Sequence, residues 1–118
     1  MRTGRLDRAA GVMVGLACGD ALGAAYEFGG PYSADMPVEM KGGGAFGWEP
    51  GEWTDDTSMA IPLLELIETG ERPRDQNFRS VVTRWIEWME DAKDVGGQTS
   101  AVLEETRRAS RGEFYRLH

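Results

Sequence analysis

The chain has 118 residues, of which 20 are acidic and 13 are Lys or Arg, so its net charge is −7. A surface of this sign repels phosphate backbones and argues against nucleic acid as a partner. The single cysteine, Cys18, excludes an internal disulfide and is typical of the reducing cytoplasm. The most apolar stretch, residues 12–26, is shorter than the ~20 residues of a membrane span and contains an aspartate. We therefore expect one cytoplasmic domain, residues 1–118, with no membrane segment and a modest core.

A first helix is expected over about residues 6–28, where Ala, Val, Leu and Met predominate. Its glycines recur four residues apart and so share one helical face; they are Gly11, Gly15, Gly19 and Gly23. Each glycine in a helix costs about 1 kcal/mol relative to alanine, so the four together cost roughly 4 kcal/mol. We expect a neighbouring backbone to pack against this stripe and offset that cost, which would make the helix central and buried.

A loop rich in glycine and aromatic residues follows over residues 29–53. Loops of this length are uncommon in compact domains, and they are usually either functional or disordered. A second helix is expected over residues 55–69, and it is apolar on nearly every side after a polar first turn, as buried helices are. Pro62 removes one backbone hydrogen bond from this helix and is expected to kink or break it, and Gly70 is a plausible stop.

Two further helices are expected in the C-terminal half. Asp75 is a candidate N-cap for a helix whose apolar stripe has three-four spacing and comprises Phe78, Val81, Val82, Trp85, Ile86 and Met89. A last helix is expected over about residues 98–110, after a turn at residues 94–97. Because no segment shows the alternation of a strand, the predicted fold class is all-α, a helical bundle.

The residue types limit the chemistry that the chain could perform. The only histidine, His118, is the last residue, which is a poor place for a catalytic base, so serine–histidine and cysteine–histidine mechanisms are not favoured. No cluster of Cys and His has the spacing of zinc ligands. Carboxylates and hydroxyls remain, and these hard oxygen ligands suit Mg²⁺, Mn²⁺ or Ca²⁺.

The densest polar segment stands at the start of the second helix and reads Trp53-Thr54-Asp55-Asp56-Thr57-Ser58. Adjacent carboxylates flanked by hydroxyls at a helix N-terminus stay ionised, since the helix dipole lowers their pKa values. The segment therefore predicts a cation site. An ordinary helix cap is the alternative, although one cap requires only one side chain.

Two acidic residues of the first helix are further candidates. Asp20 lies among small apolar residues, and the sequence leaves open whether it caps or bonds locally or faces a polar site. Glu27 lies between Tyr26 and Phe28, and apolar neighbours raise the pKa of a carboxyl group toward that of a general acid or base. A solvated glutamate at a helix end is the alternative for Glu27.

Together these motifs resemble the ADP-ribosylglycohydrolase family, which includes the glycohydrolase that reactivates dinitrogenase reductase. The resemblance spans about residues 6–112, and it rests on motif order and spacing, because either main motif alone would be weak. The matching segments are Gly19-Asp20-Ala21-Leu22-Gly23, then Glu27-Phe28, then Gly51-Glu52-Trp53-Thr54-Asp55-Asp56-Thr57, with a weaker one at Asp94-Val95-Gly96-Gly97-Gln98-Thr99.

The resemblance implies an all-α fold, a pair of bound Mg²⁺ or Mn²⁺ ions, and hydrolysis of the glycosidic bond between ADP-ribose and its acceptor. By this match Thr54, Asp55 and Asp56 are metal ligands, and Glu27 is the acidic residue near the scissile bond. Asp20 matches a family position of less certain role. The implied partner is an ADP-ribosylated protein or a small ADP-ribose conjugate. Two metals and a carboxylate suffice for such a reaction without histidine.

The chain also departs from the family. Family domains are much longer, and their second acidic motif, an Asp-x-Asp followed by Thr or Ser, has no counterpart here. We therefore expect a truncated, N-terminal part of the family fold that supplies the first half of the site and binds metal weakly on its own. One alternative is a non-catalytic helical module that keeps the family fold without a complete metal site. A partner-binding cluster of arginines is less favoured than a solvated helix face, because glutamates alternate with Arg107, Arg108, Arg111 and Arg116.

Overall fold

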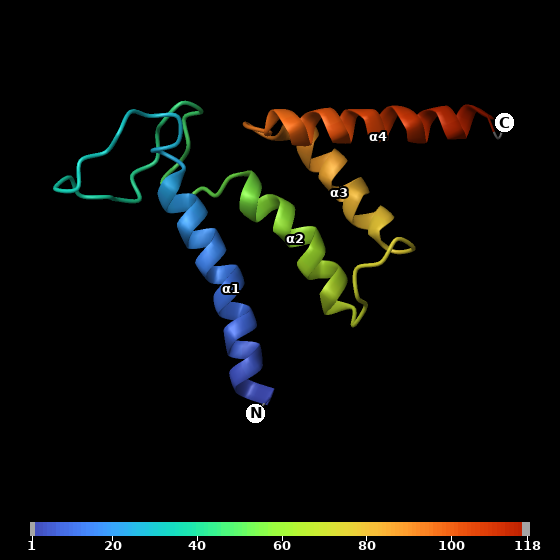
Figure 1. The fold of residues 1–118 in the computed structure, drawn as a ribbon, viewed down its shortest axis with the longest axis horizontal. Helices are drawn as coiled ribbons and strands as arrows, with labels where there is room; N and C mark the ends of the chain where they lie inside the picture. The colour runs from blue at the N-terminus through green and yellow to red at the C-terminus, as the bar shows by residue number, and fades with distance from the viewer. Residues whose placement is uncertain (1, 117–118) are drawn as a thin grey trace. The chain divides into compact units, whose positions relative to one another are not determined.

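The computed structural model describes residues 2–116, and these form helices joined by loops, with a single isolated bridge outside them (Figure 1). The helices of the described residues are α1 (Arg2–Gly23), α2 (Asp55–Glu68), α3 (Phe78–Asp91) and α4 (Gly97–Arg116). This confirms the predicted all-α class. Within residues 2–116, no helix is long and apolar enough to cross a membrane. The chain divides into two compact units, Met1–Ser58 and Met59–His118.

In the first unit, α1 ends earlier than the sequence predicts. The helix stops at Gly23, and the amides of Tyr26 and Glu27 both donate to the Gly23 carbonyl, at 2.9 and 3.2 Å. The chain then reaches Phe28 in the left-handed region, with φ of 63°. A non-glycine residue in that region cannot continue a right-handed helix. Glu27 therefore lies in a turn beyond the helix rather than on it.

Among the described residues of the first unit, no backbone packs against the glycine stripe of α1. A Cβ atom added at Gly11, Gly15, Gly19 or Gly23 would meet no atom within 4 Å, apart from the helix's own backbone and the adjoining residues. Among residues 4–23 only Ala21 is buried, and Val12 is 69% exposed. The prediction of a central, buried first helix is therefore wrong for the part of the chain that the structure describes.

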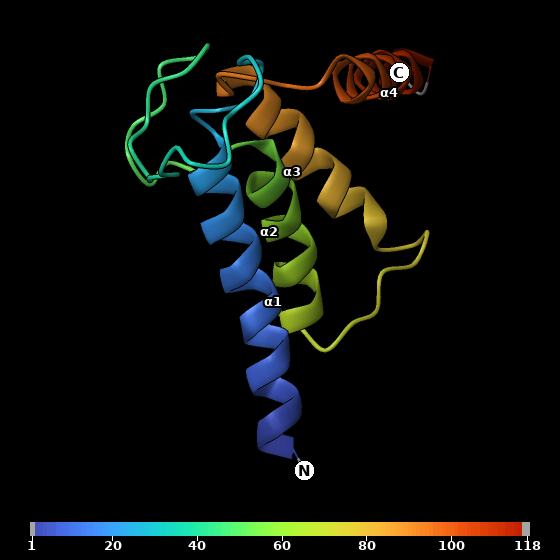
Figure 2. The ribbon, with the colours of Figure 1, turned by 60° about the vertical axis from the view of Figure 1, so that its left-hand side comes forward.

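The loop over residues 29–53 gathers at the C-terminal end of α1 (Figures 1 and 2). Gly43 and Trp48 pair as an antiparallel bridge, with N–H···O distances of 2.6 and 2.9 Å. Gly44 lies directly against the turn after α1, since a Cβ there would be 2.9 Å from the Ala25 carbonyl oxygen. The glycines therefore allow the loop to fold closely onto the end of α1, and it has a defined conformation.

Aromatic side chains hold the same loop in place. The Phe46 ring lies 5.9 Å from that of Phe28 and 6.0 Å from that of Trp48, and Trp48 is buried. The Tyr26 hydroxyl accepts from the Glu39 amide at 2.9 Å and donates to the Glu39 carbonyl at 3.1 Å. These contacts connect the loop to the turn that contains Glu27.

In the second unit, the C-terminal part of α2 continues past Pro62 to Glu68, so the proline does not break the helix. Gly70 follows in the left-handed region, with φ of 84°, as expected of a helix stop. Pro62 and Leu66 are buried, but Ile67 is 53% exposed. The prediction that α2 is buried on all sides is therefore wrong for the described residues.

The apolar stripe predicted for α3 is confirmed. Each residue of the stripe is buried or half-buried, and Val81 is 1% exposed. The predicted cap is wrong: Asn77, not Asp75, occupies the N-cap position, and its side chain makes no capping bond. The Asn77 side chain instead accepts from the Arg74 amide at 2.8 Å and donates to the Glu71 carboxylate at 2.8 Å. It therefore shapes the loop before the helix.

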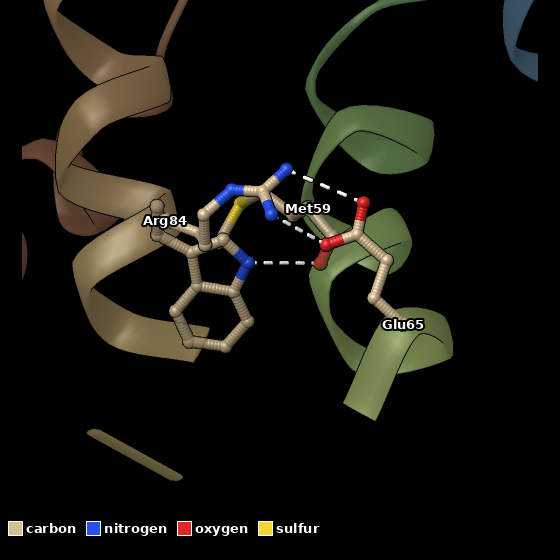
Figure 3. A network of polar contacts seen from close by, with 4 residues as sticks. Met59, Glu65 and Arg84 are labelled. Atoms are coloured by element: carbon tan, nitrogen blue, oxygen red, sulfur yellow. Dashed lines mark hydrogen bonds and ion pairs between the residues drawn. The ribbon is translucent and has the colours of Figure 1, made fainter. Parts of the chain in front are cut away.

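Side-chain bonds connect α3 to residues 59–68 of α2 (Figure 3). The Trp85 indole donates to the Met59 carbonyl at 2.8 Å, and Arg84 forms an ion pair with Glu65 at 2.6 Å. On the other side α3 contacts α4, whose residue Leu103 is buried. α4 extends beyond the predicted residues 98–110, and its Arg107 pairs with Glu104 at 2.7 Å. That pair supports a solvated helix face for this part of the arginine cluster.

Replacing Gly42 by alanine should destabilise the chain more than replacing Gly43. Both residues have positive φ, so each substitution carries the left-handed cost of roughly 1–2 kcal/mol. A Cβ at Gly42 would also lie 2.5 Å from the Trp48 carbonyl oxygen, whereas one at Gly43 would meet nothing within 4 Å. Urea unfolding of the two variants measures the difference, and equal stability losses would contradict the packing of this loop.

Trp85→Phe should destabilise the second unit more than Arg84→Met does. The indole bond to Met59 is part-buried, so its loss removes about 1 kcal/mol and leaves a carbonyl to be resolvated. The Arg84–Glu65 pair is about half exposed, and such pairs contribute roughly 0–1 kcal/mol. Thermal unfolding by circular dichroism compares the two; a larger loss in Arg84→Met would contradict this ranking.

Candidate active site

One carboxylate in α1 holds the segment that opens α2. Asp20 Oδ2 accepts hydrogen bonds from the amides of Thr54 and Thr57, at 2.9 and 3.0 Å, and from the Thr57 hydroxyl at 2.7 Å. Asp20 Oδ1 accepts from the Thr54 hydroxyl. Thr54 and Thr57 are 4% and 2% exposed. Amides in the first turn of a helix have no partner within the helix, and Asp20 supplies one from elsewhere in the chain.

This arrangement answers the question that the sequence left open for Asp20. Its partners lie 34 and 37 positions away, so it caps a helix that is distant in sequence rather than bonding locally. Partial burial raises the pKa of Asp20, but the hydrogen bonds from Thr54 and Thr57 outweigh this and hold the pKa below its ordinary value of 3.8. Asp20 is therefore held as a carboxylate.

Asp55 and Asp56 begin α2, and Asp55 is half-buried while Asp56 is exposed. The Thr54 hydroxyl oxygen lies 3.2 Å from Asp55 Oδ1. Partial burial raises the pKa of Asp56, and the negative charges of Asp55 and Asp20 raise it further. The charges of Asp55 and Asp20 thus produce a negative potential at Asp56 that a cation would relieve.

A cleft of about 570 Å³ adjoins these residues. It is lined by Gly15, Leu16, Gly19, Asp20, Gly23, Ala24, Glu27, Thr54 and Asp56. Glu27 from the turn and Asp56 from α2 thus border the same space. The glycine stripe that was predicted to contact a backbone instead forms a wall of the cleft. Glu27 is exposed rather than enclosed by its aromatic neighbours, as the alternative interpretation had it.

The donor atoms suit a hard cation but do not complete a site. Thr54, Asp55 and Asp56 offer hydroxyl and carboxylate oxygens, which Mg²⁺ and Mn²⁺ prefer. Within residues 2–116, no three or more His, Cys, Asp and Glu side chains converge closely enough to hold a metal ion. His118 lies outside the described residues. The described residues therefore offer oxygen donors of the kind a hard cation prefers, but no converging set of them.

Thr57 is the residue whose importance sequence reasoning missed. It belongs to the motif noted in the sequence, but no role was assigned to it. Its position three residues after Thr54 could have indicated this role. Residues with this spacing flank the first turn of a helix, where the backbone amides need acceptors from outside the helix. The identity of the acceptor, Asp20, was not visible in the spacing.

The sequence matches the profile of the ADP-ribosylglycohydrolase family over residues 1–115. The chain belongs to this family. It is 42% identical over 105 residues to an ADP-ribosylarginine hydrolase of Serratia proteamaculans, covering 85% of this chain and 28% of that protein. A second protein with this name, from Pseudomonas putida, is 38% identical over 104 residues, covering 84% of this chain and 28% of that protein.

A third relative is the ADP-ribosyl-[dinitrogen reductase] glycohydrolase of Rhodospirillum rubrum, which is 46% identical over 61 residues. This match covers 48% of the chain and 21% of that protein. The chain thus spans less than a third of the length of the curated relatives that it matches. The N-terminal motifs of the family are present in a segment much shorter than those relatives.

Asp20→Asn should lower the stability of the chain by about 2–3 kcal/mol, because hydrogen bonds to a charged acceptor contribute more than neutral ones. The side-chain amide of the new asparagine also places an N–H donor among the amides and hydroxyls of Thr54 and Thr57, which are themselves donors. Asp35→Asn is the matched control, since Asp35 is exposed and accepts only from the Ser33 hydroxyl among the side-chain bonds described. Chemical unfolding measures both, and equal losses would contradict the capping role of Asp20.

Proposed function

We propose that the chain supplies the first half of a metal-dependent site that hydrolyses the bond between ADP-ribose and an amino-acid side chain of a protein. The observation that carries this proposal is the meeting of Asp56 and Glu27 at one cleft, beside Thr54, in a member of this family. Arginine is the favoured acceptor, because two relatives are named ADP-ribosylarginine hydrolases.

Thr54, Asp55 and Asp56 would hold Mg²⁺ or Mn²⁺ in this proposal. Partial burial raises the pKa of Asp56, and the charges of Asp55 and Asp20 raise it further; this negative charge beside Asp56 supports the proposal, since it favours cation binding. When bound, such an ion orients a water molecule and the ribose hydroxyls and stabilises developing negative charge. Further ligands would come from outside the described residues.

Glu27 is the candidate for proton transfer. Its carboxylate would accept a proton from water as the water oxygen bonds to C1 of the ribose. It would then give the proton to the nitrogen that leaves C1, so that the free side chain and ADP-ribose are the products. A carboxylate that lines the same cleft as Thr54 and Asp56 has a suitable place for this exchange.

A second candidate is a non-catalytic helical module. The incomplete convergence of ligands within residues 2–116 favours it. Such a module would keep the Asp20 contacts, since these support the fold, but it would not respond to divalent metal. Metal binding by the chain therefore distinguishes the two candidates.

Millimolar Mg²⁺ or Mn²⁺ should raise the melting temperature of the 118-residue chain, and Asp55→Ala should remove the increase. A ligand that binds only the folded state stabilises it by about 2.7 kcal/mol at one hundred times its Kd. Asp35→Ala, a change of an exposed aspartate in the loop, should keep the metal response. A cooperative melt without any metal response would instead favour the non-catalytic module.

Hydrolysis is tested in a chimera in which residues 1–115 replace the matching segment of the Serratia relative. The chimera should release ADP-ribose from an ADP-ribosylated arginine protein, and Glu27→Gln should lower kcat about 10²–10⁴-fold. Glu68→Gln, at the exposed end of α2, is the control that should leave kcat unchanged. Full activity in Glu27→Gln would exclude Glu27 as the proton carrier.

A further inference from the structure

We infer that Asp20 and Thr57 act together as positioning residues, which orient the Thr54 hydroxyl and the first turn of α2 toward a cation. Asp20 is not itself a ligand in this inference, although it lines the cleft. The inference rests on the proposed function, because it concerns the same metal-binding segment. The sequence left the role of Asp20 open and assigned no role to Thr57.

The acceptor capacity of the Asp20 carboxylate is filled. A carboxylate has about four lone-pair sites. Asp20 accepts two hydrogen bonds from backbone amides and two from hydroxyls, and both threonines that donate them are buried. Binding a cation through Asp20 would break some of these bonds and leave buried donors unsatisfied, which is costly. The carboxylate is therefore committed to Thr54 and Thr57.

The Thr54 hydroxyl lies between the Asp20 and Asp55 carboxylates. A hydroxyl has one proton, and that of Thr54 is donated to Asp20 Oδ1. Asp55 Oδ1, at 3.2 Å, is a second and more distant acceptor for the same hydroxyl. Two electron-rich oxygens held side by side suit neighbouring positions on one hard cation. The bond to Asp20 also polarises the Thr54 hydroxyl and increases the negative charge on its oxygen.

Thr57 is almost fully buried and donates to Asp20 through both its amide and its hydroxyl. Two bonds from one residue fix the rotation of the first turn about the α2 axis. That rotation decides whether Asp56, the residue before Thr57, borders the cleft. Without the Thr57 hydroxyl, Asp20 Oδ2 would keep its two amide donors, so the helix would remain capped but its carboxylate would be less firmly oriented.

The test is a titration of the 118-residue chain with Tb³⁺, a hard cation that takes oxygen ligands and whose emission is sensitised by a nearby tryptophan. Trp53 precedes Thr54 and is 45% exposed, so it reports binding at this segment. Thr57→Val removes the hydroxyl and keeps the shape of the side chain. It should weaken Tb³⁺ binding about 10- to 100-fold, the usual effect of removing a group that orients a metal ligand. Thr57→Ser keeps the hydroxyl and should restore binding.

Thr69→Val is the matched control, because the Thr69 hydroxyl donates to the Leu66 carbonyl at 2.6 Å at the far end of α2. It should leave Tb³⁺ affinity unchanged. Trp53→Phe should abolish the sensitised emission and so confirm where the ion binds. Circular dichroism of every variant establishes that its helices remain.

Wild-type affinity in Thr57→Val, with binding lost in Asp55→Ala, would overturn the positioning role and leave the proposed function standing. Wild-type affinity in Asp55→Ala, or absence of sensitised emission from the unmodified chain, would overturn the proposed function itself. Loss of helix signal in Thr57→Val would also overturn the inference, since the threonine would then support the fold rather than the ligands.

Discussion

The first unit depends on a carboxylate that satisfies the amides of a helix formed by a different part of the chain. Thr54 and Thr57 are buried, and their amides and hydroxyls would be costly to leave without acceptors. Asp20 accepts from all four groups and so fixes the first turn of α2 against the last turns of α1. Glu27 follows α1 by a short turn, so the same contact brings Asp56 and Glu27 to one cleft. The geometry of the candidate site is thus a consequence of how one helix is capped.

The carboxylates of this site differ because their neighbours differ. Asp20 is surrounded by donors, and the hydrogen bonds that it accepts lower its pKa despite partial burial. Asp56, at the cleft, has its pKa raised by partial burial and by the charges of Asp55 and Asp20. One carboxylate is therefore stabilised by the protein, while another lies in a potential that only added positive charge would relieve. This difference between the two carboxylates is the electrostatic basis of the proposed cation site at the cleft.

Local sequence patterns predicted local structure, but they did not predict the contacts between residues that are distant in the sequence. The apolar stripe around Val81 predicted α3 correctly, because packing of one helical face leaves a three-four signature in the sequence. The polar motif around Thr54 also predicted the start of a second helix, and α2 begins at Asp55. The bonds from Asp20 to residues 34 and 37 positions away left no such signature. Nor did the left-handed conformation of Phe28, which follows the turn after α1.

The glycine stripe shows why spacing alone does not specify a contact. Gly15, Gly19 and Gly23 share a face of α1 whether that face meets a backbone or an open space, and the sequence is identical in both cases. In the described residues this face borders the cleft, and any larger side chains there would project into it. Three glycines weaken a helix by roughly 3 kcal/mol relative to alanines. Within the described residues this cost coincides with an open helical face beside the cleft, which is the room that the proposed ligand would need.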